Sequence, residues 1–177
     1  MVVEAAKIRS FPKWVRWSII GIVVIAIPFA VYWTTLPRTA EDAILKGRYS
    51  VAADLLAVRA NSGDAVAQNM LGNLYYLGLG VERNQRLASK WYLASALANN
   101  GDAQINVARQ YRLGYGLKLD GLRSYAWLRQ ARANNIEIAE VYLTWLASRL
   151  LSNEVQVAQK RFQTLEDLTP SKEKGGL

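Results

Sequence analysis

Neither cysteine nor histidine occurs in this chain of 177 residues, and the two absences exclude several kinds of site. Without cysteine there is no disulfide bond and no thiol nucleophile, and without histidine there is no imidazole base. Zinc, haem and iron–sulfur centres lose their usual ligands. A catalytic site would depend on Asp, Glu, Lys, Tyr or Ser alone, and we expect neither a metal nor a cofactor.

Runs of like charge are also missing, although the chain is basic. The formal net charge is +8, 20% of the residues are charged and 51% are hydrophobic. No stretch holds five or more like charges, so the sequence lacks the basic arm that is typical of nucleic-acid binding. The composition indicates a folded domain with a core rather than a disordered or wholly membrane-embedded chain.

The amino-terminal region contains a long apolar stretch. Residues 17–33 carry no charge, and as a helix rising about 1.5 Å per residue they would span about 25 Å, near the lower limit for a bilayer. Interfacial aromatic residues flank the stretch and a proline lies within it: Trp14, Trp17, Pro28, Tyr32 and Trp33. We predict a transmembrane helix at 14–35 after a cytoplasmic segment at 1–13.

The basic residues around this stretch favour a cytoplasmic amino terminus. Four precede it, Lys7, Arg9, Lys13 and Arg16, and only Arg38 lies within the ten residues that follow it. The carboxy-terminal domain is then expected outside the cytoplasm. A cleaved signal peptide and a buried helix of a soluble core remain as alternatives.

A pattern of tyrosine, glycine and tryptophan occurs twice, 36 residues apart. Tyr75, Gly78, Gly80 and Trp91 recur as Tyr111, Gly114, Gly116 and Trp127, and the pair Ala67–Gln68 recurs as Ala103–Gln104 and again as Ala139–Glu140. Alanine and glycine allow close helix packing, glycine favours a left-handed helix C-cap, and the Asn84 and Asp120 positions are suited to helix N-caps. The spacing predicts stacked helical hairpins, with the aromatic residues in the core.

The domain at 39–168 is therefore expected to be all-α. Periodicity and cap residues predict helices at about 40–46, 50–61, 65–77, 84–99, 103–113, 121–134, 137–150 and 153–167. Asn100 and Gly101 are expected to end the fourth of these helices. The first and last hairpins depart from the pattern, as terminal repeats do, and 169–177 is expected to be a disordered tail.

Residues 67–104, AQNMLGNLYYLGLGVERNQRLASKWYLASALANNGDAQ, resemble a Sel-1-like repeat, a relative of the tetratricopeptide repeat. The match rests on Ala67, Leu71, Gly72, Tyr75, Gly78, Gly80, Val81, Ala88, Trp91, Ala96 and Gly101. The best-matching units are 67–102 and 103–138; in the second, Ala108 replaces Gly72 and Leu117 replaces Val81, which keeps small and apolar character. The resemblance implies an α-solenoid that binds proteins and has no enzyme activity.

Side chains off the core face of the first helices are the candidate binding residues. In solenoids of this kind the first helices of the hairpins line one concave face. We hypothesise a groove there for an acidic or extended partner segment, formed by Asn69, Asn73, Tyr76, Arg109, Arg112 and Trp145. The alternative is an ordinary surface, with Trp145 buried under the last helix.

Three functions remain open. The first is a scaffold or adaptor, anchored by one helix in the bacterial inner membrane with its repeats in the periplasm, that binds and stabilises a partner protein or complex at the cell envelope. The second is a periplasmic chaperone or quality-control factor beside a translocation or assembly machine. The third, an enzyme using Glu137 and Glu140, is disfavoured because no motif places the two acids, which are expected on a solvated face. We expect neither nucleic acid nor a small-molecule substrate.

Overall fold

The computed structural model describes residues 39–164, 167 and 168. The chain divides into two units, Met1–Arg38 and Thr39–Leu177, and the fold reported below is that of the second. The predicted segments at 1–13, 14–35 and 169–177 lie outside the described residues. Within the described part, none of the helices combines the length and the apolar character that crossing a membrane requires.

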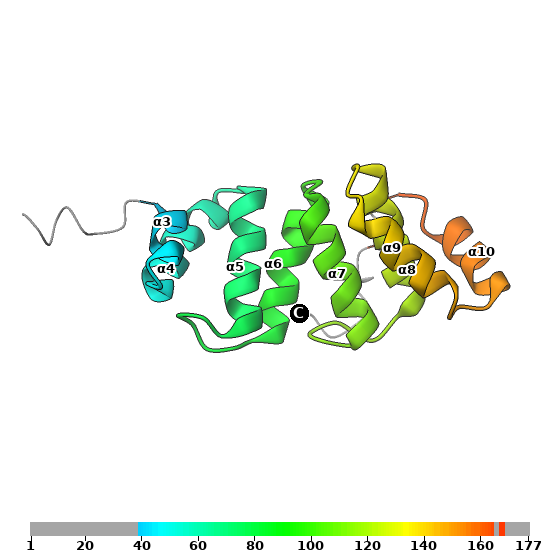
Figure 1. The fold of residues 1–177 in the computed structure, drawn as a ribbon, viewed down its shortest axis with the longest axis horizontal. Coiled ribbons are helices and arrows are strands. Elements are labelled where there is room, and N and C mark those ends of the chain that lie inside the picture. Colours follow the sequence, from blue (N-terminus) through cyan, green and yellow to red (C-terminus); the bar gives the residue numbers. More distant parts are fainter. Residues whose placement is uncertain (1–38, 165–166, 169–177) are drawn as a thin grey trace, which may run out of the picture. The chain divides into compact units, whose positions relative to one another are not determined.

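All regular secondary structure in the described part is helical (Figure 1). The helices are α3 (Ala40–Leu45), α4 (Tyr49–Asn61), α5 (Ala65–Leu77), α6 (Gln85–Leu97), α7 (Gly101–Leu113), α8 (Gly121–Ala133), α9 (Ile138–Ala147) and α10 (Ser152–Arg161). From α3 to α9, each helix packs against the next one in the chain. The described part is therefore a solenoid of hairpins stacked in sequence order, as the spacing of 36 residues predicts.

The helix ends follow the residue types that recur in the repeat. Gly78 and Gly114 end α5 and α7 with left-handed backbone, at φ values of 73° and 70°. Asn84 and Asp120 cap α6 and α8 because their side chains accept backbone amide hydrogens of the first turn. The two glycine-rich segments are therefore helix ends, as predicted, and the turns between the helices of each hairpin follow them.

Asn100 and Gly101 begin a helix, and the prediction that they end one is wrong. Helix α6 already ends at Leu97. The Asn100 side chain accepts the backbone amide hydrogen of Ala103 at 2.9 Å, so α7 begins at Gly101 rather than at residue 103. A side chain at position 101 would collide with Ile136, which packs there from the next interhelical turn.

The last hairpin differs most from the prediction. Helix α9 is shorter than the predicted 137–150, and α10 ends at Arg161 rather than at residue 167. After α10, the Asp167 carboxylate accepts the backbone amide hydrogens of Gln163 and Thr164, at 3.2 and 2.9 Å. This local hydrogen bonding replaces the helical pattern, and it lets Phe162 turn into the core with 6% of its surface exposed.

The position of α10 leaves one side of α9 exposed to solvent. Helix α10 packs against α8 rather than forming an extensive contact with α9. Four apolar or aromatic side chains of α9 consequently keep large exposed fractions: Ile138 52%, Val141 66%, Tyr142 42% and Trp145 40%. Two members of this exposed row, Tyr142 and Trp145, also line the candidate site.

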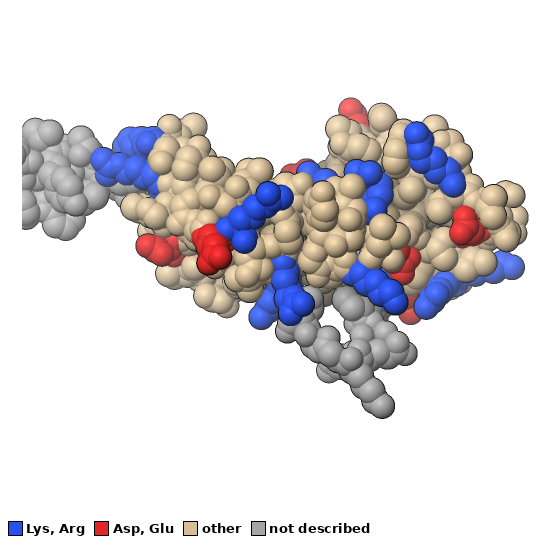
Figure 2. All heavy atoms as spheres, turned by 90° about the horizontal axis from the view of Figure 1, so that it is seen from below, with Lys and Arg blue, Asp and Glu red and all other residues tan. Residues whose placement is uncertain are grey.

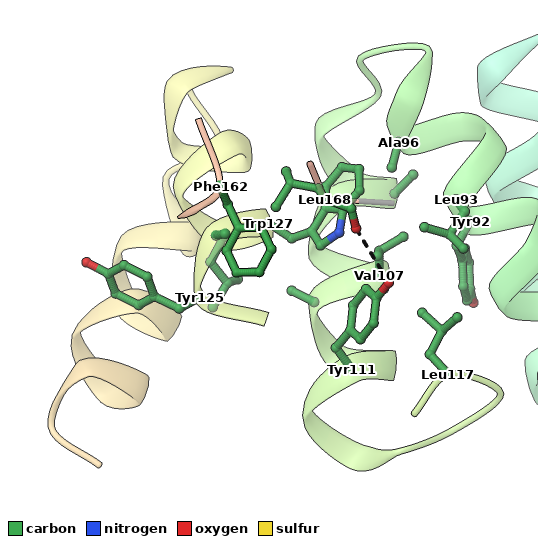
Figure 3. Packing of buried hydrophobic residues seen from close by; sticks show 14 of the residues in the cluster. Tyr92, Leu93, Ala96, Val107, Tyr111, Leu117, Tyr125, Trp127, Phe162 and Leu168 are labelled. Carbon is green, nitrogen blue, oxygen red and sulfur yellow. Dashed lines mark hydrogen bonds between the residues drawn. The ribbon is translucent and has the colours of Figure 1, made fainter. Parts of the chain in front are cut away.

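Two clusters of buried side chains form the core. One joins α3, α4 and α5, and the other joins α6, α7, α8, α9, α10 and Leu168 (Figure 3). Trp127 is fully buried in the second cluster, Trp91 is half-buried against the first, and Tyr75 packs against both. The repeat tryptophans thus contribute to the core, as predicted. In the second cluster, the Tyr111 hydroxyl donates to the Leu168 carbonyl at 3.5 Å.

Candidate protein-binding face

Helices α5, α7 and α9 are the first helices of successive hairpins, and they carry all six predicted binding residues. We call the surface formed by these and three neighbouring side chains the first-helix face: Asn69, Asn73, Tyr76, Ile105, Asn106, Arg109, Arg112, Tyr142 and Trp145. The side chains of α5 and α7 meet across it, because Asn106 Nδ2 donates to Asn69 Oδ1 at 2.9 Å. The face is therefore continuous from one hairpin to the next.

Arg109 organises the half of the face that lies over α5 and α7. Its Nη2 donates to Asn106 Oδ1 at 2.8 Å, and its Cζ lies 4.8 Å from the centroid of the Tyr76 ring. Asn106 was not among the predicted binding residues, because the repeat register points to position 105 instead. Only the hydrogen bond between the two helices shows that residue 106 faces Asn69.

A core residue fixes the orientation of the Asn73 side chain. The Tyr92 hydroxyl, at the end of a fully buried side chain on α6, donates to Asn73 Oδ1 at 2.7 Å. Burial raises the pKa of Tyr92 to about 12, so this hydroxyl keeps its proton at neutral pH. The orientation of Asn73 is thus determined by a buried donor rather than by solvent.

Trp145 lies in the other half of the face and is not buried under the last helix. The Cζ atom of Arg112 lies 5.2 Å from the centroid of the Trp145 ring, and that of Arg149 lies 3.9 Å from it. The second contact was missed in the sequence, although Arg149 follows Trp145 by four residues, the spacing at which helical side chains meet. Since α10 packs on α8, no helix among the described residues covers this ring.

A cavity of about 60 Å³ lies where α7, α8 and α9 meet. Its lining combines apolar side chains with two guanidinium groups and a hydroxyl: Ile105, Ala108, Arg109, Arg112, Ser124, Leu128, Tyr142, Trp145 and Leu146. The predicted residues Arg109, Arg112 and Trp145 therefore share one cavity, whereas Asn69, Asn73 and Tyr76 lie beside it.

The basic groups of the face have no acidic partner among the described residues. The ion pairs in the described part of the chain involve Arg59, Arg123, Arg132 and Lys46. None of them involves Arg109, Arg112 or Arg149. Figure 2 shows basic side chains spread over one side of the molecule, with acidic side chains between them. The face is consequently suited to an anionic or hydrogen-bond-accepting partner.

The two acids considered for catalysis lie at the start of α9, Glu137 at its N-cap and Glu140 in its first turn. Both are exposed, and Glu140 Oε2 accepts from Arg132 Nη1 at 3.2 Å. Gln68 and Gln104 occupy the positions that are equivalent to Glu140 in the two preceding units. Each donates a side-chain hydrogen bond to the backbone carbonyl of the residue eight positions earlier, which lies in the preceding helix. Glu140 therefore makes the third of these links between successive hairpins. No cluster of three potential metal ligands occurs in the part of the chain that the structure describes.

Comparisons with known proteins support the repeat architecture. The model of the Sel1 repeat matches residues 65–100 and 101–135, close to the predicted units at 67–102 and 103–138. A comparison with curated proteins finds no match.

Two solved structures resemble the described domain. A Sel1 repeat protein from Oxalobacter formigenes is 31% identical with a TM-score of 0.58, over 60% of this chain and 44% of that one. A protective antigen present in uropathogenic Escherichia coli strains, displaying an SLR fold, is 21% identical with a TM-score of 0.65, over 78% of this chain and 34% of that one. This chain thus spans less than half the length of either protein. Residues 65–135 thus match two Sel1 repeats, and the two structures resemble the α-solenoid of the described domain.

Proposed function

We propose that this protein is a membrane-anchored scaffold or adaptor that binds and stabilises a partner protein or complex at the bacterial cell envelope. Sel1 repeat proteins generally mediate protein–protein interactions, and this chain carries two matching repeats. The observation that supports binding most directly is that Arg109 and Arg112 on the first-helix face, and Arg149 beside it, have no acidic partner among the described residues.

The partner segment is acidic or extended, and it lies along α5, α7 and α9. Arg109 and Arg112 donate forked hydrogen bonds to its carboxylates, a geometry that guanidinium groups favour. Tyr76 and Trp145 supply aromatic surface beside these charges, and such aromatic and arginine anchors contribute most of the binding energy in many interfaces. Asn69 is hydrogen-bonded to Asn106 within the face, and Asn73 is hydrogen-bonded to Tyr92 of the core, so both side chains have fixed orientations beside Tyr76.

The anchor and the location form a separate part of the proposal. They rest on the uncharged stretch at 17–33, its aromatic flanks and the four basic residues before it. In this arrangement the amino terminus is cytoplasmic, one helix crosses the inner membrane, and the repeats lie in the periplasm.

Charge reversal on the face tests the scaffold. The full chain, tagged at its carboxyl terminus, is expressed in its native host and purified from gently solubilised membranes, and co-purifying proteins are identified. We expect one stoichiometric partner, and we expect Arg109→Glu with Arg112→Glu to lower its recovery roughly 100-fold, since a hydrogen bond to a charged group contributes about 1.5–3 kcal/mol.

The matched control is Lys90→Glu with Lys118→Glu, which makes the same change in net charge at two exposed positions outside the face. Circular dichroism establishes that both double variants are folded. Unchanged capture by the Arg109 and Arg112 variant would remove the proposed binding face.

A chaperone or quality-control role is the second candidate, and the exposed apolar row on α9 favours it. Val141 and Trp145 expose 66% and 40% of their surfaces, and such a surface suits weak binding of many unfolded clients. The same purification separates the two functions, because a chaperone brings down many substoichiometric proteins and a scaffold brings down one partner.

A further inference from the structure

We propose that the cavity between α7, α8 and α9 binds a single carboxylate of the partner polypeptide, inserted on a short aliphatic stem. The inference rests on the proposed function, in which a protein partner lies along the first-helix face. It adds the point at which that partner is anchored, because one of its carboxylates enters this cavity.

The shape of the cavity suits a short stem. Most of its walls are apolar, formed by Ile105, Ala108, Leu128 and Leu146. A water molecule needs roughly 10–15 Å³ of such space, so a cavity of 60 Å³ accommodates a carboxylate with one or two methylene groups. A phosphoryl group carries about two charges and three strong acceptor oxygens, and the apolar walls would leave part of that group without donors.

Two buried polar atoms of the cavity residues lack partners in the structure. Ser124, a residue with only 1% of its surface exposed, makes no hydrogen bond through its Oγ, and Arg109 makes none through its buried Nε. Buried polar groups are nearly always paired in folded proteins. Ser124 also departs from the repeat, because the equivalent residue of the preceding unit is Ala88. A carboxylate, which only accepts hydrogen bonds, pairs with both donors.

The charges around the cavity favour the same group. Arg109 and Arg112 line it, and Arg149 stacks on the Trp145 ring that forms part of its wall. No acidic residue lines the cavity, and none of these three arginines is in an ion pair within the described ranges. The Trp145 ring, which is 40% exposed, is placed to cover the stem while the guanidinium groups bind its charge.

Two sources supply this chemistry, an Asp or Glu side chain within the partner and the carboxyl terminus of the partner. Four peptide probes distinguish them. Acetyl-Gly-Gly-Leu-Glu-Gly-Gly-amide carries only a side-chain carboxylate, and its counterpart has Gln in place of Glu. Acetyl-Gly-Gly-Leu-Gln-Gly-Leu carries only a terminal carboxylate, and its counterpart is the amide.

Binding is measured on the full chain in detergent micelles, labelled with 5-fluorotryptophan and observed by fluorine NMR. The Trp145 signal is assigned with Trp145→Phe, and the buried Trp127 serves as an internal reference. We expect one of the two carboxylate probes to shift the Trp145 signal saturably, with at least tenfold weaker binding of its neutral counterpart. The proposal is overturned if no carboxylate probe shifts the signal, or if the neutral counterparts bind equally well.

Two variants test whether the probe binds in the cavity. Ser124→Ala introduces the residue found at the equivalent position and should weaken binding about tenfold without loss of thermal stability, since an unpartnered buried hydroxyl is removed. Arg149→Gln should weaken it similarly, whereas Arg83→Gln, exposed on the loop before α6, should leave binding unchanged.

The outcomes separate this inference from the proposed function. Probe binding that is insensitive to both Ser124→Ala and Arg149→Gln overturns the cavity, even where the Arg109 and Arg112 double variant has lost its partner. Retained capture by that double variant overturns the proposed function itself.

Discussion

Tyr92 and Tyr111 are the two tyrosines whose ionisation is most affected by the fold. Their exposed fractions are 0% and 2%, and burial raises the pKa of each hydroxyl to about 12. Both hydroxyls also donate hydrogen bonds, to Asn73 Oδ1 and to the Leu168 carbonyl. The folded chain therefore holds these groups in their neutral form over a wider range of pH than the unfolded chain does.

This difference predicts an alkaline loss of stability. A tyrosine in the unfolded chain ionises near pH 10, so the stabilisation is fully present below about pH 10 and declines as the pH rises toward about 12. Spectrophotometric titration of tyrosinate should show that two of the nine tyrosines ionise last.

Tyr92→Phe supplies the control for that titration, because it should remove one of the two late groups and leave the other. The prediction is wrong if all tyrosines ionise together near pH 10 while circular dichroism shows that the helices are intact.

The contact between α5 and α6 differs from the equivalent contact between α7 and α8. In the first pair, a Cβ at Gly72 would lie 2.7 Å from the Tyr92 ring. In the second pair, Ala108 and Leu128 occupy these positions. Both solutions fill the space between two helices, one with glycine and a large ring, the other with alanine and a smaller side chain.

We therefore expect the effect of Gly72→Ala on the free energy of unfolding to change sign with the residue at position 92. In the native chain it should lower the free energy of unfolding by about 1–3 kcal/mol, because the buried ring cannot move away from the added methyl group. In a Tyr92→Leu background it should raise that free energy by about 1 kcal/mol, the difference in helix propensity between alanine and glycine.

Urea unfolding of the four chains in this cycle measures both effects. Equal effects of Gly72→Ala in the two backgrounds would show that the methyl group and the ring do not compete for the same space.

At the scale of the whole molecule, stacking creates a face that no single hairpin possesses. The turn after each first helix packs against the start of the preceding hairpin's second helix: Gly80 approaches Tyr49, and Gly116 approaches Gln85, 36 residues later. The same contact made twice keeps successive hairpins in one register. It also aligns α7 with α5, and the cavity among α7, α8 and α9 is shared between two units.

The proposed anchor is a property of the whole chain. Reporter proteins fused to each end should show a cytoplasmic amino terminus and a periplasmic carboxyl terminus, and alkaline carbonate should not release the protein from membranes. Both results follow from the uncharged stretch at 17–33 and the basic residues before it.

Replacing Lys7, Arg9, Lys13 and Arg16 with glutamine is the matched variant, and it should weaken the bias in orientation while leaving the apolar stretch intact. Release by carbonate, or a cytoplasmic carboxyl terminus in the native chain, would contradict the proposed anchor.

The sequence by itself determined the order of the helices and most of their ends. Helix caps and turns depend on residues close to one another in the chain, so Gly78, Asn84, Gly114 and Asp120 could be assigned from their spacing alone. The repeat also placed Arg109, Arg112 and Trp145 on one helical face, because positions 36 residues apart occupy equivalent places in a regular stack.

Only the tertiary structure decided which side chains meet and which remain exposed. Asn106 and Ser124 join the site through the meeting of different helices, and the repeat pattern does not mark them. The exposure of Trp145 likewise depends on α10, which packs against α8 rather than over α9. Helices form from local periodicity, whereas the pairing of side chains depends on how helices distant in the chain come to lie together.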